Sequence, residues 1–347
     1  MLKKMSFISK TMLFINIVVA ITTLMAYLLP FLAPKWFPFL SVLSLFLPFF
    51  LVVNLLFFTY WLMQFKKYIF VSGLVLLLGI TFINKFYNLI STELPKTENE
   101  FTIMSYNVRL FNKFNWYKKA NIPTKIAEFV SEKNPDILCI QEYSDLENTK
   151  FSNYKFHHIF KKGNNIIVGN AIFSKYKIVD KGVINFPNST NNAVYADIIK
   201  GNDTLRIYSM HLQSIKISTD IEEEEIQKMN ESKTKYIFRK ISDAFTKQHE
   251  QSLLIKQHYL ECKFKKIICG DMNNSAFSFV YRTIKGSMQD AFESNGEGFG
   301  KTYNFKYYPA RIDYIFADKT IQIKSFETLN DFYNSDHFPL ISRLEIK

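Results

Sequence analysis

The chain divides between an apolar N-terminal part and a longer part in which apolar and polar runs alternate. Three stretches without a charged side chain open it, at residues 11–34, 36–65 and 68–84. The first two exceed the roughly 20 residues that a helix needs to cross a bilayer core, and the third is near the lower limit. We therefore predict three transmembrane helices and assign residues 1–84 to a membrane anchor. A cleaved signal peptide would explain the first stretch but not the other two.

The lysines around these stretches predict the orientation of the anchor. Lys3, Lys4 and Lys10 precede the first stretch, and Lys66 and Lys67 separate the second from the third. Positive residues favour the cytoplasmic side, so the N-terminus and the second loop are expected inside. Three crossings then give an integral protein of the cytoplasmic (inner) membrane with an extracytoplasmic catalytic domain. The lipid bilayer is its expected partner, and no protein partner is predicted.

The remainder of the chain has the pattern of an α/β domain. Residues 85–99 are polar and unpatterned, which predicts a linker to a domain at residues 100–347. Within this domain, short apolar runs rich in β-branched and aromatic residues predict strands. These runs are residues 101–108, 136–142, 166–174, 193–199, 205–212, 266–272, 311–317 and 340–346. Helices are predicted at residues 123–133 and 221–262, and the alternation favours layered α/β packing.

Charge and cysteine content narrow the function only slightly. Residues 1–97 carry eight Lys or Arg and one acidic residue, so +7 of the net charge of +12 lies there. The remaining +5 makes the C-terminal domain only mildly basic, and charge alone does not argue for nucleic acid. Cys139, Cys262 and Cys269 are odd in number and irregularly spaced, so they form no disulfide framework. The acidic run 222–225 is typical of a solvated first helical turn rather than of a metal site.

Polar side chains stand near the ends of several predicted strands, where binding sites of α/β sheets collect. They are Asn107, Glu142, His211, Asp271, Asn273, Asp313, Asp336 and His337. Any one of them alone would more often be a turn residue, a helix cap or a structural hydrogen-bonding group. Together they combine hard oxygen ligands suited to Mg²⁺, with Mn²⁺ possible, and two histidines that can hold or transfer protons.

The blocks around these residues resemble a known family. They are MSYNVR (104–109), DILCIQE (136–142), YSMHLQS (208–214), CGDMNNS (269–275), RIDYIF (311–316) and SDHFPL (335–340). In this order they resemble the endonuclease/exonuclease/phosphatase superfamily, which shares its fold with deoxyribonuclease I, over about residues 100–347. The resemblance implies a four-layer α/β/β/α sandwich of two packed mixed sheets. It also implies a metal-dependent phosphoric ester hydrolase.

The resemblance further implies a role for each residue. The catalytic set would be Asp271, His337, His211 and Asp336; the phosphate ligands Asn273, His337 and His211; the metal ligands Glu142, Asn107 and Asp336; and the supporting residue Asp313. Asp271 resembles the aspartate that positions and deprotonates the attacking water. Asp336 resembles the carboxylate that orients His337.

The expected function is therefore a membrane-anchored phosphoesterase that hydrolyses a phosphodiester or phosphomonoester by metal-assisted attack of water. A divalent cation would neutralise charge on the anionic ester and lower the pKa of the bound water. The substrate stays open between nucleic acid and a phospholipid or sphingolipid head group. The alternative is a catalytically inactive membrane-bound binding or scaffold protein with the same fold, and the intact set of polar residues counts against it.

Overall fold

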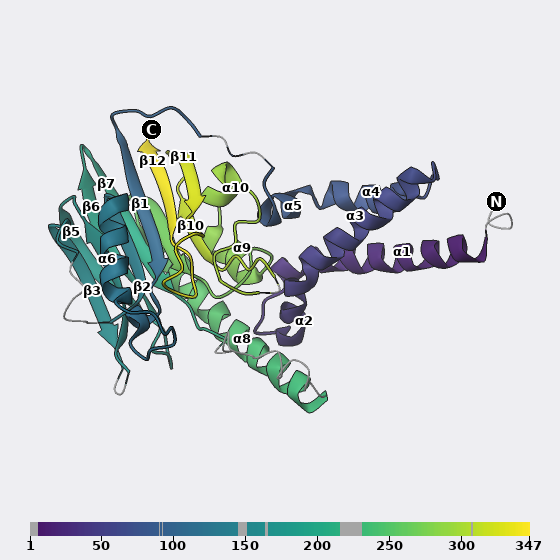
Figure 1. Cartoon of the computed structure of the whole chain (residues 1–347), viewed down its shortest axis with the longest axis horizontal. Coiled ribbons are helices and arrows are strands. Elements are labelled where there is room, and N and C mark those ends of the chain that lie inside the picture. The colour runs from purple at the N-terminus through teal and green to yellow at the C-terminus, as the bar shows by residue number, and fades with distance from the viewer. Residues whose placement is uncertain are drawn as a thin grey trace.

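The apolar N-terminal part forms a helical bundle that extends from one end of a two-sheet domain (Figure 1). The computed structural model describes residues 6–89, 91, 93–144, 151–163, 166–215, 231–306 and 308–347. The bundle consists of α1 (Phe7–Ala26), η2 (Leu29–Phe31), α2 (Pro38–Leu43), η3 (Ser44–Phe46), α3 (Leu47–Met63), α4 (Ile69–Leu78) and α5 (Ile80–Phe86). The start of α1 lies at the end of the bundle that is remote from the sheets.

Two helical segments of the bundle are long and apolar enough to cross a membrane, at Phe7–Phe31 and Pro38–Met63. The prediction of a third continuous span at residues 68–84 is wrong, because α4 and α5 meet at an angle of 69°. The bend lies at Gly79, where a side chain would collide with the ring of Tyr27. The Tyr27 hydroxyl donates a hydrogen bond to the Val75 carbonyl (2.9 Å), so the residue that caps the end of α1 fills the bend.

Buried polar side chains join the helices of the bundle. Asn16 of α1 donates to the Ser72 hydroxyl of α4 (2.7 Å) and accepts a hydrogen bond from Trp61 Nε1 of α3 (3.0 Å). Asn54 of α3 donates to the Thr23 hydroxyl of α1 (2.8 Å). Interhelical hydrogen bonds of this kind hold helices together where the hydrophobic effect between them is weak.

The C-terminal domain contains two six-stranded mixed sheets, ordered β11-β12-β1-β2-β4-β3 and β5-β6-β7-β8-β10-β9. The first sheet is built from β1 (Glu100–Asn107), β2 (Ile137–Tyr143), β3 (Phe156–Lys162), β4 (Val168–Ser174), β11 (Ile321–Thr328) and β12 (Leu340–Ile346). The second is built from β5 (Ile178–Asn185), β6 (Asn192–Lys200), β7 (Asp203–His211), β8 (Lys265–Asp271), β9 (Gln289–Asp290) and β10 (Asp313–Ala317). The pairs β1–β2 and β7–β8 are parallel.

Apolar side chains fill three layers between and outside these sheets. Ile103 and Cys139 of the first sheet pack against Ile207 and Ile267 of the second in the central core. Helix α6 (Ile122–Lys133) covers the outer face of the first sheet. Helices α8 (Glu231–Glu261) and α9 (Phe279–Lys285) cover the outer face of the second, while the short α10 (Ala291–Asn295) follows β9. The α/β fold with two packed mixed sheets is confirmed.

The eight predicted strands all form, with boundaries shifted by one or two residues. Strands β3, β5, β9 and β11 and helices α9 and α10 were not predicted. All four of these strands lie at sheet edges, and in β3 and β5 half-exposed side chains interrupt the apolar pattern. The helix predicted at residues 123–133 is confirmed as α6. Of the helix predicted at residues 221–262, the structure describes α8 from Glu231 onward, and the acidic run 222–225 lies outside the described residues.

The stretch predicted as a linker lies against the domain. Asn88 pairs with Gly298, and its amide donates to the Phe292 carbonyl (2.6 Å). Leu94 donates from its backbone to the Lys324 carbonyl (2.9 Å). These hydrogen bonds attach the described part of residues 85–99 to the domain. We call this segment the strap.

Candidate active site

Four polar side chains meet because two parallel strand pairs end at the same place. Asn107 closes β1 and Glu142 lies at the end of β2, which runs parallel to it. His211 and Asp271 close β7 and β8 and are register partners. Since the two sheets pack face to face, the carboxyl ends of these four strands bring their side chains into one buried space.

Asp271 is the most heavily bonded of these groups. Its carboxylate accepts hydrogen bonds from the Asn273 backbone (2.7 Å) and from the side-chain amides of Asn273 and Asn107 (both 3.0 Å). Burial raises the pKa of Asp271 to about 6, although His337 acts in the opposite direction. A buried carboxylate with this pKa remains ionised at neutral pH and is a stronger base than an ordinary aspartate.

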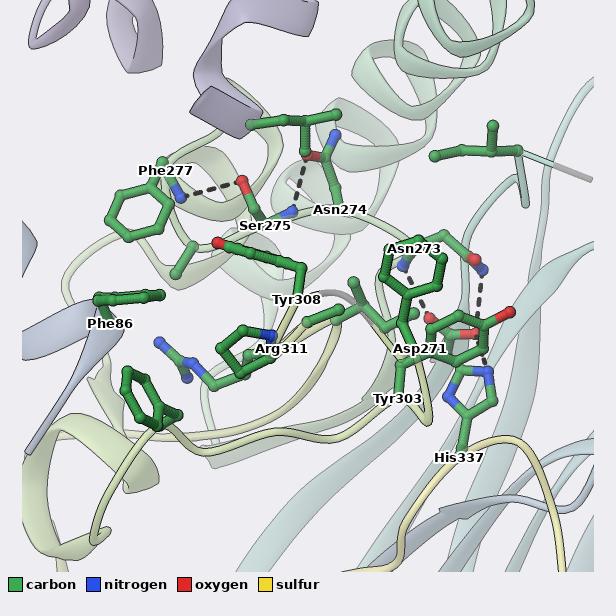
Figure 2. A pocket seen from close by; sticks show the side chains of 18 of the residues that line it. Phe86, Asp271, Asn273, Asn274, Ser275, Phe277, Tyr303, Tyr308, Arg311 and His337 are labelled. Atoms are coloured by element: carbon green, nitrogen blue, oxygen red, sulfur yellow. Dashed lines mark hydrogen bonds and ion pairs between the residues drawn. The ribbon is translucent and has the colours of Figure 1, made fainter. Parts of the chain in front are cut away.

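The two histidines approach the same oxygen of Asp271. His337 Nε2 is 3.7 Å from Asp271 Oδ2 (Figure 2). The other ring nitrogen of His337, Nδ1, is 2.9 Å from Asp313 Oδ2. Burial alone would lower the pKa of His337, but the carboxylates of Asp313 and Asp271 raise it to about 10. His211 Nε2 is 3.6 Å from Asp271 Oδ2 and has no hydrogen-bond partner among the described residues, and burial lowers the pKa of this histidine.

The prediction that Asp336 orients His337 is wrong. Asp336 Oδ2 lies 3.3 Å from Arg109 Nε, and Asp313 binds the imidazole instead. Asp313 is the register partner of Asp271 on the neighbouring strand, which places its carboxylate beside the histidine. The assignment of Asp336 as a metal ligand and catalytic residue stays a prediction.

Glu142 owes its position to an irregular backbone. The pairing of β2 with β4 shifts register between Ile140 and Tyr143, and Glu142 has a φ of 52°. A left-handed conformation costs a non-glycine residue on the order of 1–3 kcal/mol and is found where function requires it. Its carboxylate lies 3.4 Å from the Asn107 amide, and burial raises its pKa.

The buried acids fit a hard divalent cation. Carboxylate oxygens of Asp271 and Asp313 lie within 4.8 Å of each other and of a His337 ring nitrogen, and the Glu142 and Asp271 carboxylates both face the Asn107 amide. Burial opposes the ionised form of both Glu142 and Asp271, and a cation between them would remove that penalty. The oxygen-rich donor set suits Mg²⁺ or Mn²⁺.

Two contributors to the site were not predicted. The ring of Tyr303 packs edge-on against His337, with ring centroids 4.9 Å apart. The Thr302 hydroxyl accepts a hydrogen bond from the Asp313 backbone (3.1 Å) and so fixes the start of β10. Both residues lie in a loop without periodic pattern, and no sequence signal distinguishes them. Arg109 lies within the MSYNVR block but had been given no role.

The site opens into a cavity of about 610 Å³. Glu142, Asp271, Asn273 and His337 line one part of it. Figure 2 shows His337 and Asp271 at one side and Phe86, Phe277 and Tyr308 at the other. The polar residues therefore form one end of a larger cavity whose other end is lined by apolar and aromatic side chains.

Comparison with known proteins agrees with this geometry. Residues 104–337 match the sequence family described as Endonuclease/Exonuclease/phosphatase family, and residues 9–86 match a domain of unknown function. No curated protein matches the chain.

Solved structures share the fold. The human Nocturnin catalytic domain is 19% identical over 75% of this chain and 97% of its own, with a TM-score of 0.55. D. rerio TDP2 complexed with single strand DNA product is 18% identical over 72% of this chain and 100% of its own (TM-score 0.50). A Bacteroides thetaiotaomicron mannosyl-6-phosphatase is 17% identical over 70% of this chain and 99% of its own (TM-score 0.50). At these identities the likeness shows the fold alone.

Proposed function

The chain belongs to the endonuclease/exonuclease/phosphatase family, and from that premise we propose that it is a membrane-anchored, divalent-metal-dependent phosphoesterase. The observation that carries the proposal is the buried cluster of Asp271, Asp313 and His337 beside Glu142 and Asn107. Solved structures with this fold include a DNA-bound protein and a sugar phosphatase, so the fold does not choose the substrate.

Each side chain has a chemical task in ester hydrolysis. Asp271, with its raised pKa, accepts a proton from the attacking water. His337 is protonated at neutral pH and held by Asp313, so it donates a hydrogen bond as negative charge builds on the phosphoryl oxygens. His211 Nε2 lies in the same space and offers a second donor to the phosphate. Asn273 adds an amide beside Asp271.

A divalent cation, when bound, supplies charge neutralisation on the ester and a more acidic water. Glu142 and Asp271 would hold it, because both carboxylates accept a hydrogen bond from the Asn107 amide nitrogen and burial opposes the charge of both acids. Asn107, whose Oδ1 accepts a hydrogen bond from the Arg109 backbone, stays a predicted ligand. Asp336 remains a candidate ligand, although Arg109 already balances its charge.

Membrane anchoring is supported by the two long apolar helical segments. Their exposed faces are rich in large apolar residues such as Phe14, Leu24, Leu56 and Met63, which water would not favour. Lys66, between α3 and α4, lies at the end of the bundle away from the domain. By the positive-inside rule, we propose that the bundle lies in the cytoplasmic membrane and that the domain lies outside the cytoplasm.

Hydrolysis of bis-p-nitrophenyl phosphate by the detergent-solubilised full chain tests the proposal. We expect turnover with Mg²⁺ or Mn²⁺, loss of turnover with a chelator, and a fall of about 10²–10⁴-fold in Asp271→Ala. Asp180→Ala is the matched control, because the Asp180 side chain is 59% exposed and lies away from the site. Absence of turnover with every divalent metal tried would favour the inactive scaffold protein.

A further inference from the structure

The N-terminal helices contribute side chains to the same cavity as the candidate active site. Leu45 and Phe46 of η3, Phe49 of α3 and Phe86 of α5 line it together with Asp271. All four residues precede Asp271 by more than 180 residues in the sequence. The helical part therefore forms a wall of the active-site cavity.

This wall is firmly packed on the domain. Phe86 contacts Phe299 edge-on (ring centroids 5.2 Å apart) and stacks with Tyr308 (6.3 Å). Phe277 shares a buried apolar cluster with Leu29 and Leu47 of the bundle. Aromatic contacts and a buried apolar cluster therefore attach the wall directly to the domain that carries the catalytic residues.

The chemistry of the lining changes along the cavity. Carboxylates and imidazole groups lie at the catalytic part, and aromatic rings from both the domain and the bundle form the remainder (Figure 2). Apart from the His337 imidazolium, Lys85 and Arg311 are the cationic residues among the described residues that line it. Arg311 is paired with Asp290 (2.8 Å), and Lys85 lies over the ring of Tyr281 (5.0 Å to the centroid), so neither presents an open basic surface.

The apolar wall continues along the outside of α3. Phe49, Val52 and Leu56 recur at helical spacing and are 61%, 43% and 63% exposed, respectively. Their stripe leads from the cavity along a helix that is long and apolar enough to cross a membrane. An apolar chain that lies in the bilayer beside α3 could therefore extend into the cavity without crossing water.

We propose that the substrate is a membrane lipid phosphate ester, whose phosphate binds at His211 and His337 and whose apolar chain lies along Leu45, Phe46 and Phe49. The inference rests on the proposed hydrolase function and names its substrate class. A strand of nucleic acid would also stack on aromatic rings, but it needs an open basic groove along its backbone, which the described lining lacks. The N-terminal helices thus select the substrate as well as anchoring the enzyme.

A homologous series of alkyl p-nitrophenyl phosphates tests the inference with the full chain held in amphipol. The methyl and octyl diesters share the leaving group and the reacting phosphate and differ only in chain length. Below the micellar concentration, we expect kcat/KM to rise on the order of 10- to 100-fold from methyl to octyl, because added methylenes are buried against the wall. If the methyl ester is hydrolysed and the octyl-to-methyl ratio of kcat/KM is near 1, the inference is overturned and the hydrolase function remains intact.

Variants then locate the effect. The double variant Phe46→Ala, Phe49→Ala should lower the octyl-to-methyl ratio by about tenfold, and both side chains are more than half exposed, so their truncation is compatible with folding. Phe70→Ala is the control, since Phe70 is an exposed ring on α4 outside the cavity lining, and it should keep the wild-type ratio. Partition of the octyl ester into amphipol is the same for all variants, so it cancels when their octyl-to-methyl ratios are compared.

Two further outcomes count against the inference. An unchanged ratio in the wall variant would show that the chain lies elsewhere. A single-stranded DNA or RNA oligonucleotide hydrolysed with a higher kcat/KM than the octyl ester would assign the site to nucleic acid. Failure to hydrolyse any ester, including the methyl ester, with any divalent metal would overturn the proposed function itself. Hydrolysis of the methyl ester separates that result from a failure of the lipid inference alone.

Discussion

At the scale of single residues, the site is a balance of buried charges. Asp271 has a raised pKa because burial opposes its ionisation, and His337 has a raised pKa because two carboxylates outweigh its burial. The imidazole is thereby kept cationic and the Asp271 carboxylate basic over the same neutral pH range. Such opposed shifts at neighbouring groups are typical of catalytic acid–base pairs.

Asp313 and Asp336 should differ in their effect on the pH profile. Asp313 binds His337 directly and raises its pKa, so Asp313→Asn lowers that pKa and moves the alkaline limb of kcat to lower pH. We also expect kcat to fall by about 10²–10⁴-fold. Asp336→Asn should move the limb less, because that carboxylate contacts Arg109 instead. Equal displacement in the two variants would contradict the orientation seen here.

The buried Asp271 carboxylate should also make the fold less stable at neutral pH. Its folded pKa of about 6 exceeds the ordinary value of 3.8, so the folded state takes up a proton first as the pH falls. From pH 7.5 to 5, the free energy of unfolding of the wild type should therefore rise relative to Asp271→Asn by roughly 1 kcal/mol. Thermal unfolding of the metal-free full chain in detergent measures this, and a difference independent of pH would refute it.

At the scale of elements, the bundle is a specifically packed unit. Asn16 joins α1 to both α3 and α4, and Asn54 joins α3 to α1. The bend at Gly79 turns α5 toward the domain, where Phe86 reaches the cavity. A single straight third helix would not place that ring in the same position, so the departure from the predicted span has a consequence for the site.

Removing the Asn16 side chain should loosen the bundle. Asn16→Leu leaves the Ser72 hydroxyl and Trp61 Nε1 without these bonds, at a cost of about 1 kcal/mol for the two. We expect a lower Tm and a changed fluorescence of Trp61 in detergent. The control is Thr22→Val, because the Thr22 hydroxyl bonds to Val18 of its own helix. Similar losses of stability in the two variants would argue against an interhelical role for Asn16.

At the scale of the whole molecule, the two-sheet domain lies at the end of α1 opposite to its start (Figure 1). The chain reaches this end along α1, leaves it along α3 and returns through α4 and α5 to the strap at Asn88. If the bundle lies in a membrane, the domain and the α3–α4 turn must face opposite sides. The bent pair then completes the third crossing, although it is not one straight helix.

Cysteine labelling tests this arrangement. Lys319→Cys in the domain should react with a membrane-impermeant maleimide on intact spheroplasts, and Lys66→Cys should react only after permeabilisation. Both positions are exposed, whereas native Cys139 and Cys269 are buried and Cys262, which is partly exposed, is replaced by serine. Labelling of both introduced cysteines from the same side would contradict the proposed topology.

Much of the site could be predicted because it consists of strand ends. The apolar runs before Asn107, Glu142 and Asp271 predict buried strands, and polar residues directly after such runs must meet where parallel strands end together. The partner of His337 could not be found in this way. It depends on which strand pairs with β8, and the register of Asp313 with Asp271 is set by packing between distant segments.

The sequence by itself determined the division into an apolar bundle and a layered α/β domain, because helix and strand periodicities and uncharged length are local properties of a chain. Only the tertiary structure decided that Asp313 binds His337 and that α4 and α5 meet at an angle. It also decided that aromatic rings of the bundle share a cavity with Asp271; these are Phe46, Phe49 and Phe86. These are contacts between segments far apart in the chain. Their geometry depends on how the bundle packs on the domain, and no local pattern encodes it.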